Sequence, residues 1–151
     1  MDEKKVLDRL QRLCSKAEYC SADISRKALK SLEGDLQAAS RIVASLVKDS
    51  YVDDARYASA YAREKASIQG WGPVKIRYGL RLKGISGSIA DNAIAEACTE
   101  ENGLARMEKL LAAKARTLQG DPKAMQKLLR FALGRGYTYD QASPVVEKIL
   151  G

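Results

Sequence analysis

"GWGPVKIRYGLRLKGIS", residues 70–86, contains the signals for both ends of one helix and so indicates how the chain around it folds. Proline has a fixed φ that suits the first turn of a helix, so we expect this helix to begin at Pro73. Glycine tolerates the left-handed conformation that ends many helices, so we expect it to stop at Gly84. Ser86 then has the side chain of an N-cap for the next helix. The stretch therefore predicts two consecutive helices joined by a tight turn.

The glycines of this stretch also raise the alternative of a phosphate-binding loop, because a helix N-terminus that follows glycines can bind anions. The spacing Gly70-x-Gly72-x-x-Lys75 matches neither the P-loop nor the dinucleotide-binding fingerprint. No alternating strand pattern leads into the stretch. We therefore interpret these glycines as helix boundaries rather than as a nucleotide site.

Helical patterns flank the stretch on both sides. Asp53 or Asp54 can cap a preceding helix that ends near Ser67 or Ile68. The helix after the capping serine has an apolar stripe at helical spacing, made of Ile89, Ala93, Ile94 and Ala97. Together these patterns predict a unit of three helices.

The three-helix pattern repeats along the chain. Residues 75–94 match residues 127–146 at a fixed offset of 52, which places Gly84 over Gly136. Residues 27–46 are a weaker copy at an offset of about 50. Three evenly spaced copies indicate an array of similar structural units.

The first and last copies differ in detail from the middle one. The first is degenerate, with Gly34 in the column of Gly84. The last has Thr138 and Gln141 at the spacing of a capping box. Pro144 falls where a helix interior is expected, so we expect this last helix to be kinked or to start late.

The sequence therefore predicts an all-α fold of three tandem three-helix repeats that form an elongated, curved module. We expect the repeats to span residues 1–48, 49–100 and 101–151. Each is about 50 residues long, so we expect its apolar stripe to need a neighbouring repeat for burial.

The composition excludes several classes of site and of protein. With no histidine, and three cysteines that form no C-x-x-C motif, zinc sites built from Cys and His and His-dependent triads are excluded. We interpret the cysteines as small buried apolar residues. No apolar run approaches the roughly 20 residues of a membrane span, and the charged start MDEKKVLDRL is unlike a signal peptide, so we expect a cytoplasmic protein.

Candidate catalytic groups are few. Asp53 and Asp54 resemble a carboxylate dyad, but their position before a helix favours capping. Trp71 is the only tryptophan, and we expect it to pack over its own unit. Because no acid, base, nucleophile and metal ligand set converges, we expect a protein that is not an enzyme and that has no cofactor or metal.

Positive charge dominates the chain and falls in blocks. Lys and Arg number 26 against 19 Asp and Glu, which gives a net charge of +7. Basic blocks at 1–30, 63–83 and 109–136 alternate with acidic blocks, in step with the repeat. Such a balance points to an anionic partner, either nucleic acid or an acidic protein surface.

Basic residues recur on the equivalent helices of successive repeats. Because stacked repeats align equivalent faces, we expect them to form one continuous surface, which we call the basic stripe. In the second and third repeats its members are Arg63, Lys65, Lys75, Arg77, Arg81, Lys83, Lys123, Lys127, Arg130 and Arg135. In the first repeat the corresponding residues are Arg26, Lys27 and Lys30.

Residues 51–86 resemble the core signature of the bacterial regulatory protein RecX family. In that family a D-D-x-R-[FY]-A segment precedes G-x-x-x-[IL]-x-x-x-L-x-x-K-G-I and a helix-capping serine. The matching residues are Asp53, Asp54, Arg56, Tyr57 and Ala58, followed by Gly72, Ile76, Leu80, Lys83, Gly84, Ile85 and Ser86. The closing GRGYTYDQASPVVEKIL resembles the last helix pair of the family, and the resemblance is weak before residue 45.

The resemblance implies the same fold of three helical repeats and a regulatory function. Members of the family bind the filament that the RecA recombinase forms on DNA, and they restrain its strand exchange, ATPase and co-protease activities in DNA repair and the SOS response. The basic stripe would then contact RecA, single- or double-stranded DNA, or both. The alternative is a helix-turn-helix-like protein that binds DNA directly. We expect a monomer that does not bind membranes.

Overall fold

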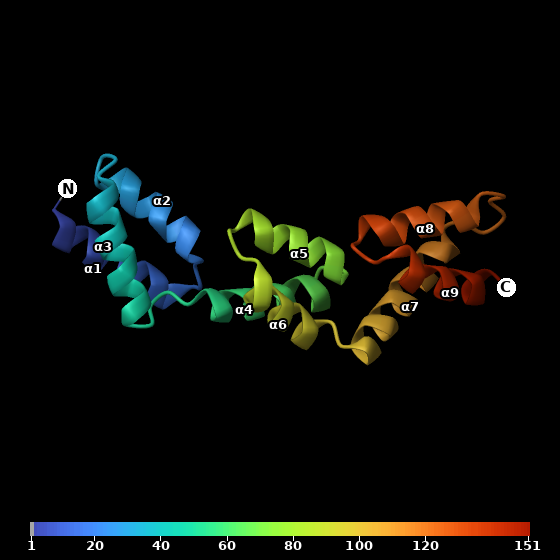
Figure 1. The fold of residues 1–151 in the computed structure, drawn as a ribbon. Helices are drawn as coiled ribbons and strands as arrows, with labels where there is room; N and C mark the ends of the chain where they lie inside the picture. The colour runs from blue at the N-terminus through green and yellow to red at the C-terminus, as the bar shows by residue number, and fades with distance from the viewer. Residues whose placement is uncertain (1) are drawn as a thin grey trace.

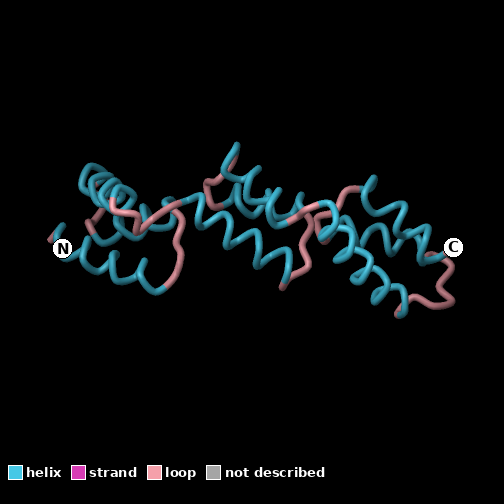
Figure 2. Tube along the Cα trace, turned by 90° about the horizontal axis from the view of Figure 1, so that it is seen from below, coloured by secondary structure: helices cyan, strands magenta, loops and turns pink. Residues whose placement is uncertain are grey.

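The computed structural model describes residues 2–151, which form nine α-helices and no β-strand. The helices are α1 (Glu3–Lys16), α2 (Ser21–Ser31), α3 (Leu36–Lys48), α4 (Asp54–Ser67), α5 (Pro73–Leu82), α6 (Gly87–Ala97), α7 (Glu100–Arg116), α8 (Ala124–Gly134) and α9 (Tyr139–Leu150). They form three groups of three in an elongated row, with the two termini at opposite ends (Figure 1, Figure 2). The expected all-α repeat fold is confirmed. Across residues 2–151, no helix is both long and apolar enough to cross a bilayer.

Each group of three helices buries an apolar core of its own. The first core is built around Val6, Leu10, Ile24, Ile42 and Leu46, the second around Ala58, Ala62, Ile76, Leu80 and Ile94, and the third around Met107, Leu111, Leu128, Ala132 and Val146. The expectation that each stripe needs a neighbouring repeat for burial is therefore wrong. Two residues cross a boundary, because Cys20, just before α2, is buried in the second core and Ala22 of α2 packs against that core.

Several helix boundaries are those that the sequence predicts. Asp53 caps α4 by accepting a hydrogen bond at 3.1 Å from a backbone N–H of the first turn, and Pro73 is the first residue of α5. Gly84 has a φ of 77° in the turn that follows α5. Thr138 and Gln141 form the expected capping box at the start of α9.

The middle unit departs from its predicted pattern at α6. Ser86 is the N-cap residue, but its side chain makes no capping hydrogen bond. Ile89 is 39% exposed, and Ala90 is buried in its place. The reason is the packing of α6 on α4, whose buried residues Ala58, Ala62 and Ala66 leave room for small side chains at the contact.

Two further differences concern the first and last units. After α2 the left-handed position is taken by Glu33, with a φ of 56°, and Gly34 follows with a φ of 87°. The glycine column is therefore displaced by one residue in the first unit. The helix that contains Pro144 starts directly after Thr138 and continues to Leu150, so it does not start late.

The units are joined by hydrogen bonds at the starts of their second helices. Neither α2 nor α5 has a side-chain cap of its own. Instead, the backbone N–H of Ser21 donates to Asp54 of the second unit at 2.7 Å, and the Ser21 hydroxyl lies 2.6 Å from the same carboxylate. The N–H groups of Gly72 and Val74 donate to the carbonyl oxygens of Arg135 and Gly136 in the third unit, at 2.6 and 2.9 Å. Each of these helices is thus capped by the next unit.

The junction between the second and third units has room only for glycine. A Cβ atom on Gly136 would lie 2.4 Å from Cβ of Lys75, and one on Gly72 would lie 2.6 Å from the carbonyl carbon of Gly136. Gly136 also has a φ of 97°, which disfavours other residues. Gly136 therefore serves both as the end of a helix and as a contact between units.

Candidate functional site

The second helices of the three units, α2, α5 and α8, follow one long side of the molecule (Figure 1). The junctions produce this arrangement, because α2 and α5 each begin against the unit that follows them. We call this side the second-helix edge.

Most residues of the basic stripe lie at the second-helix edge. Those on or adjoining α5 and α8 are Lys75, Arg77, Arg81, Lys83, Lys123, Lys127, Arg130 and Arg135. Arg63 lies apart from these residues. It is exposed on α4 two residues after Tyr61, whose hydroxyl lies against Gly79 of α5. Two residues turn a helix by about 200°, so Arg63 points away from α5.

Three cations of the basic stripe on or adjoining α5 and α8 are already paired with carboxylates. The pairs are Arg77–Asp91 at 2.6 Å, Lys83–Asp23 at 3.2 Å and Lys127–Asp121 at 2.6 Å. Hydrogen bonds from Lys127 and from a backbone N–H hold the pKa of Asp121 below its ordinary value. The Lys83–Asp23 pair joins the first and second units, so it has a structural role.

Burial and pairing act in opposite directions on Asp23. Partial burial raises the pKa of its carboxyl group, but hydrogen bonds from Cys20 and Lys83 outweigh that effect, and the pKa lies below its ordinary value. Asp23 is therefore a charged acceptor for Lys83 at neutral pH.

Three exposed cations on or adjoining α5 and α8 have no carboxylate partner within residues 2–151. They are Arg81 on α5, Lys123 at the N-cap of α8, and Arg130 on α8. Their charges are available to a partner molecule.

Two further cations lie over the ring of Trp71, where the second and third units meet. The ammonium groups of Lys65 and Lys75 lie 4.9 and 4.6 Å from the centroid of its ring, within the range of a cation–π interaction. Tyr61 contacts the same ring edge-on at 6.5 Å. Trp71 packs against the second core, as expected.

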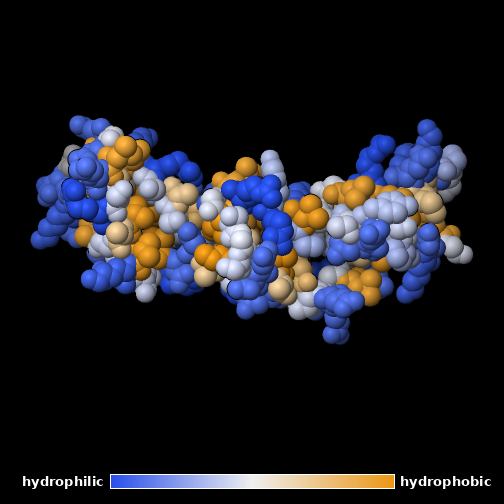
Figure 3. Space-filling model, in the orientation of Figure 1, coloured by the Kyte–Doolittle hydropathy of each residue, from blue (hydrophilic) through white to orange (hydrophobic). Residues whose placement is uncertain are grey.

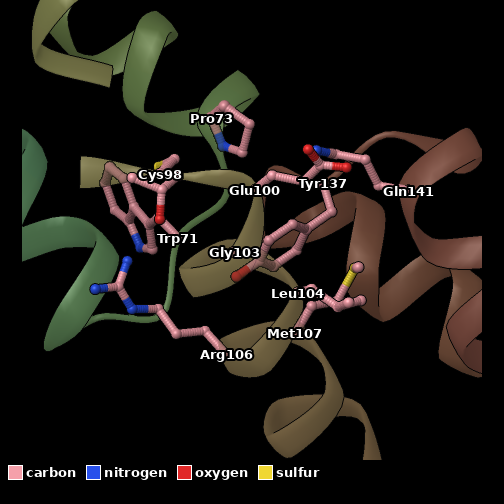
Figure 4. A pocket seen from close by; sticks show the side chains of 11 residues that line it. Trp71, Pro73, Cys98, Glu100, Gly103, Leu104, Arg106, Met107, Tyr137 and Gln141 are labelled. Atoms are coloured by element: carbon pink, nitrogen blue, oxygen red, sulfur yellow. The ribbon is translucent and has the colours of Figure 1, made fainter. Parts of the chain in front are cut away.

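A pocket of about 220 Å³ lies beside Trp71, between the second and third units (Figure 4). It is lined by Trp71, Pro73, Cys98, Thr99, Glu100, Gly103, Leu104, Arg106, Met107, Tyr137 and Gln141. Burial raises the pKa of the Cys98 thiol and of the Tyr137 hydroxyl, so both are protonated at neutral pH. Arg106 donates to the carbonyl oxygen of Ala97 at 2.7 Å. The pocket therefore offers no ionised thiol or phenol, and its arginine is engaged by the backbone at the end of α6.

The recurrence of basic residues holds for only part of the basic stripe. At the offset of 52, Lys75 corresponds to Lys127 and Lys83 to Arg135. Arg77 and Arg81 instead correspond to leucines, Leu129 and Leu133. The two arginines of α5 are thus specific to the middle unit.

Sequence reasoning missed a set of exposed apolar residues on α5. Val74, Tyr78 and Leu82 are 53%, 59% and 66% exposed. The signal was present, because they recur every four residues, displaced by two from Ile76 and Leu80 of the core. A helix with two apolar lines has one more than its own core requires.

The chain is similar to known proteins over most of its length. Family models of the RecX second and third three-helix domains match residues 53–94 and 100–146. A regulatory protein RecX from Vibrio campbellii is 35% identical over 136 residues, which cover 87% of this chain and 83% of that protein. One from Clostridium acetobutylicum is 33% identical over 129 residues, which cover 82% of this chain but 59% of that protein.

Solved structures have the same fold. The crystal structure of RecX from Lactobacillus salivarius superposes with a TM-score of 0.87 at 21% identity, covering 97% of this chain and 96% of that one. A second crystal structure, of regulatory protein RecX, gives a TM-score of 0.84 at 27% identity and covers 98% of this chain and 71% of that one. Because two RecX domain models match in tandem and the Vibrio relative is matched over most of its length, the chain belongs to the RecX family of regulatory proteins.

Proposed function

We propose that this protein binds filaments of the RecA recombinase on DNA and restrains their recombinase, ATPase and co-protease activities. The observation that carries the proposal is the second-helix edge, on which helices of successive units present cations along one side of an elongated molecule. A nucleoprotein filament is a long, repeating partner with phosphates and protein carboxylates, which suits such an edge. Membership of a family of regulatory proteins supports the same function.

The energetics favour a partner that engages several units at once. A single exposed ion pair contributes about 1 kcal/mol or less, so no one cation of the basic stripe accounts for binding. Contacts made together by one molecule add to its avidity. We therefore expect affinity to depend on several unpaired cations and to fall as salt rises.

The test is the ATPase activity of RecA on single-stranded DNA, measured with substoichiometric amounts of this protein. The informative variant is the triple change Arg81→Glu, Lys123→Glu and Arg130→Glu, which leaves the ion pairs of Arg77 and Lys83 intact. A matched control, Lys4→Glu with Lys48→Glu and Lys109→Glu, has the same change of charge on exposed residues away from the second helices.

We expect the wild-type protein and the control to inhibit RecA, and the triple variant to lose inhibition while it retains its helical circular dichroism. Inhibition by a folded triple variant at wild-type concentrations would show that the second-helix edge is not the binding face. If the wild-type protein bound naked DNA tightly and left RecA activity unchanged, direct DNA binding would replace this proposal.

A further inference from the structure

The helix α5 has a second line of apolar residues besides the one it buries. Ile76 and Leu80 are fully buried, whereas Val74, Tyr78 and Leu82 are all more than half exposed. Residues four apart lie on the same side of a helix, so these three form one continuous line along the outer face of α5. We call this line the apolar ridge.

The apolar ridge belongs to the middle unit alone. The buried residues of the three second helices coincide at the offset of 52: Ile24 and Ala28, Ile76 and Leu80, Leu128 and Ala132. At the positions of the ridge the other two helices have Ala22, Arg26 and Lys30, or Gln126, Arg130 and Gly134. The fold therefore does not require an apolar outer face at this place.

Cations border the apolar ridge. Arg77 and Arg81 lie along one side of it and are exposed, and Lys75 lies on the other side near the start of α5. Arg77 is bound to Asp91, whereas Arg81 has no carboxylate partner among residues 2–151 and can meet an acidic group. Hydrophobic and hydrophilic residues lie next to one another over α5 (Figure 3). Apolar side chains with tyrosine and arginine beside them are typical of the centre of a protein–protein interface.

We propose that the apolar ridge is a docking surface for a protein that has an apolar groove bordered by carboxylates. The inference rests on the proposed function, in which that protein is a subunit of the RecA filament. Contacts to a DNA backbone come from cations and hydrogen-bond donors. Binding to phosphates would therefore not explain why Val74 and Leu82 are exposed. An acidic, partly apolar protein surface matches both the ridge and the arginines beside it.

The test compares binding to filament and to DNA alone. The double variant Tyr78→Ser with Leu82→Ser is titrated against RecA filaments on single-stranded DNA and against the same DNA without RecA, at low and high salt. We expect filament affinity to fall at least about tenfold, since two apolar contacts are lost. The loss should persist at high salt, because apolar burial is not screened, and affinity for naked DNA should remain within about twofold of wild type.

Two further variants keep the comparison decisive. The matched control Leu36→Ser with Ile68→Ser changes side chains that are 70% and 76% exposed and that lie outside the second helices, so it should bind filaments as wild type does. If the double variant loses its circular dichroism, Tyr78→Arg replaces it, because arginine occupies the equivalent position in α2 and α8.

Three results would overturn the inference. Unchanged filament affinity of the folded ridge variant would show that the ridge is not an interface. An equal loss on naked single-stranded DNA would assign Tyr78 to base stacking instead. Failure of the wild-type protein to bind filaments at all would remove the proposed function, and this inference with it.

Discussion

A methyl group on Gly136 would overlap the backbone of the neighbouring unit, whereas one on Gly84 would not. Both glycines have positive φ values, 97° and 77°. A Cβ on Gly84 would meet only Cβ of Ala22 at an ordinary 3.5 Å, but one on Gly136 would lie 2.7 Å from the backbone nitrogen of Lys75. Comparing an alanine substitution at each glycine therefore distinguishes the cost of backbone strain from the cost of a steric clash between units.

We expect Gly84→Ala to lower the free energy of unfolding by roughly 1 kcal/mol, the cost of a left-handed alanine. Gly136→Ala should lower it by about 2 kcal/mol or more, because the third unit must also move away from α5. Urea denaturation of both variants measures the difference. Equal losses of unfolding free energy in the two variants would show that the junction accommodates the added methyl group without a cost in stability.

At the scale of elements, the starts of α2 and α5 show how one unit completes another. The first N–H groups of a helix have no partner within that helix, and Cys20 and Gly72 supply no side-chain acceptor. Asp54 and the carbonyl oxygens of the α8–α9 turn accept these hydrogen bonds from across the junctions. The adjacent carboxylates Asp53 and Asp54 therefore have different roles, since Asp53 caps its own helix and Asp54 caps α2.

We expect Asp54→Ala to destabilise the protein by about 1 kcal/mol and to remove hydrogen-exchange protection from the first turn of α2. Asp53→Ala should cost a similar amount but leave the amide of Ser21 protected, because it acts on α4 alone. Amide exchange followed by NMR distinguishes the two. Retained protection of Ser21 in the Asp54→Ala variant would contradict capping between units.

Signals that act within one helix could be predicted from the sequence, and signals that act between elements could not. Pro73, Gly84 and Thr138 fix local backbone geometry, so the helices that they bound were predicted correctly. The exposure of Ile89 depends on how closely α6 approaches α4, which no local pattern reveals. The pairing of Arg77 with Asp91 likewise joins residues whose distance the fold sets. The sequence places Arg63 near the end of α4 that adjoins α5, but it does not reveal that the turn of α4 directs this side chain away from α5.

For the whole molecule, separate cores joined by narrow junctions imply limited cooperativity. The helices pack mainly within their own units, and the second and third units meet at the loop before α5 and the turn after α8. Repeat proteins of this kind are stabilised by the units and by the interfaces between neighbours. The junctions are the places where local opening should cost least.

Trp71 makes that opening measurable, because it is the only tryptophan and lies at the junction of the second and third units. We expect its fluorescence to change in two steps as urea rises, the first with little loss of helical circular dichroism, since the units separate before their cores unfold. Gly136→Ala should move the first step to lower urea by more than it moves the second, because it weakens the contact with Lys75 in addition to straining its own turn. Gly84→Ala is the control, and it should leave the first step where it is in wild type. Superimposable fluorescence and circular dichroism curves in the wild-type protein would show instead that the three units unfold as one. The narrow junctions would then couple the units more strongly than their few contacts suggest.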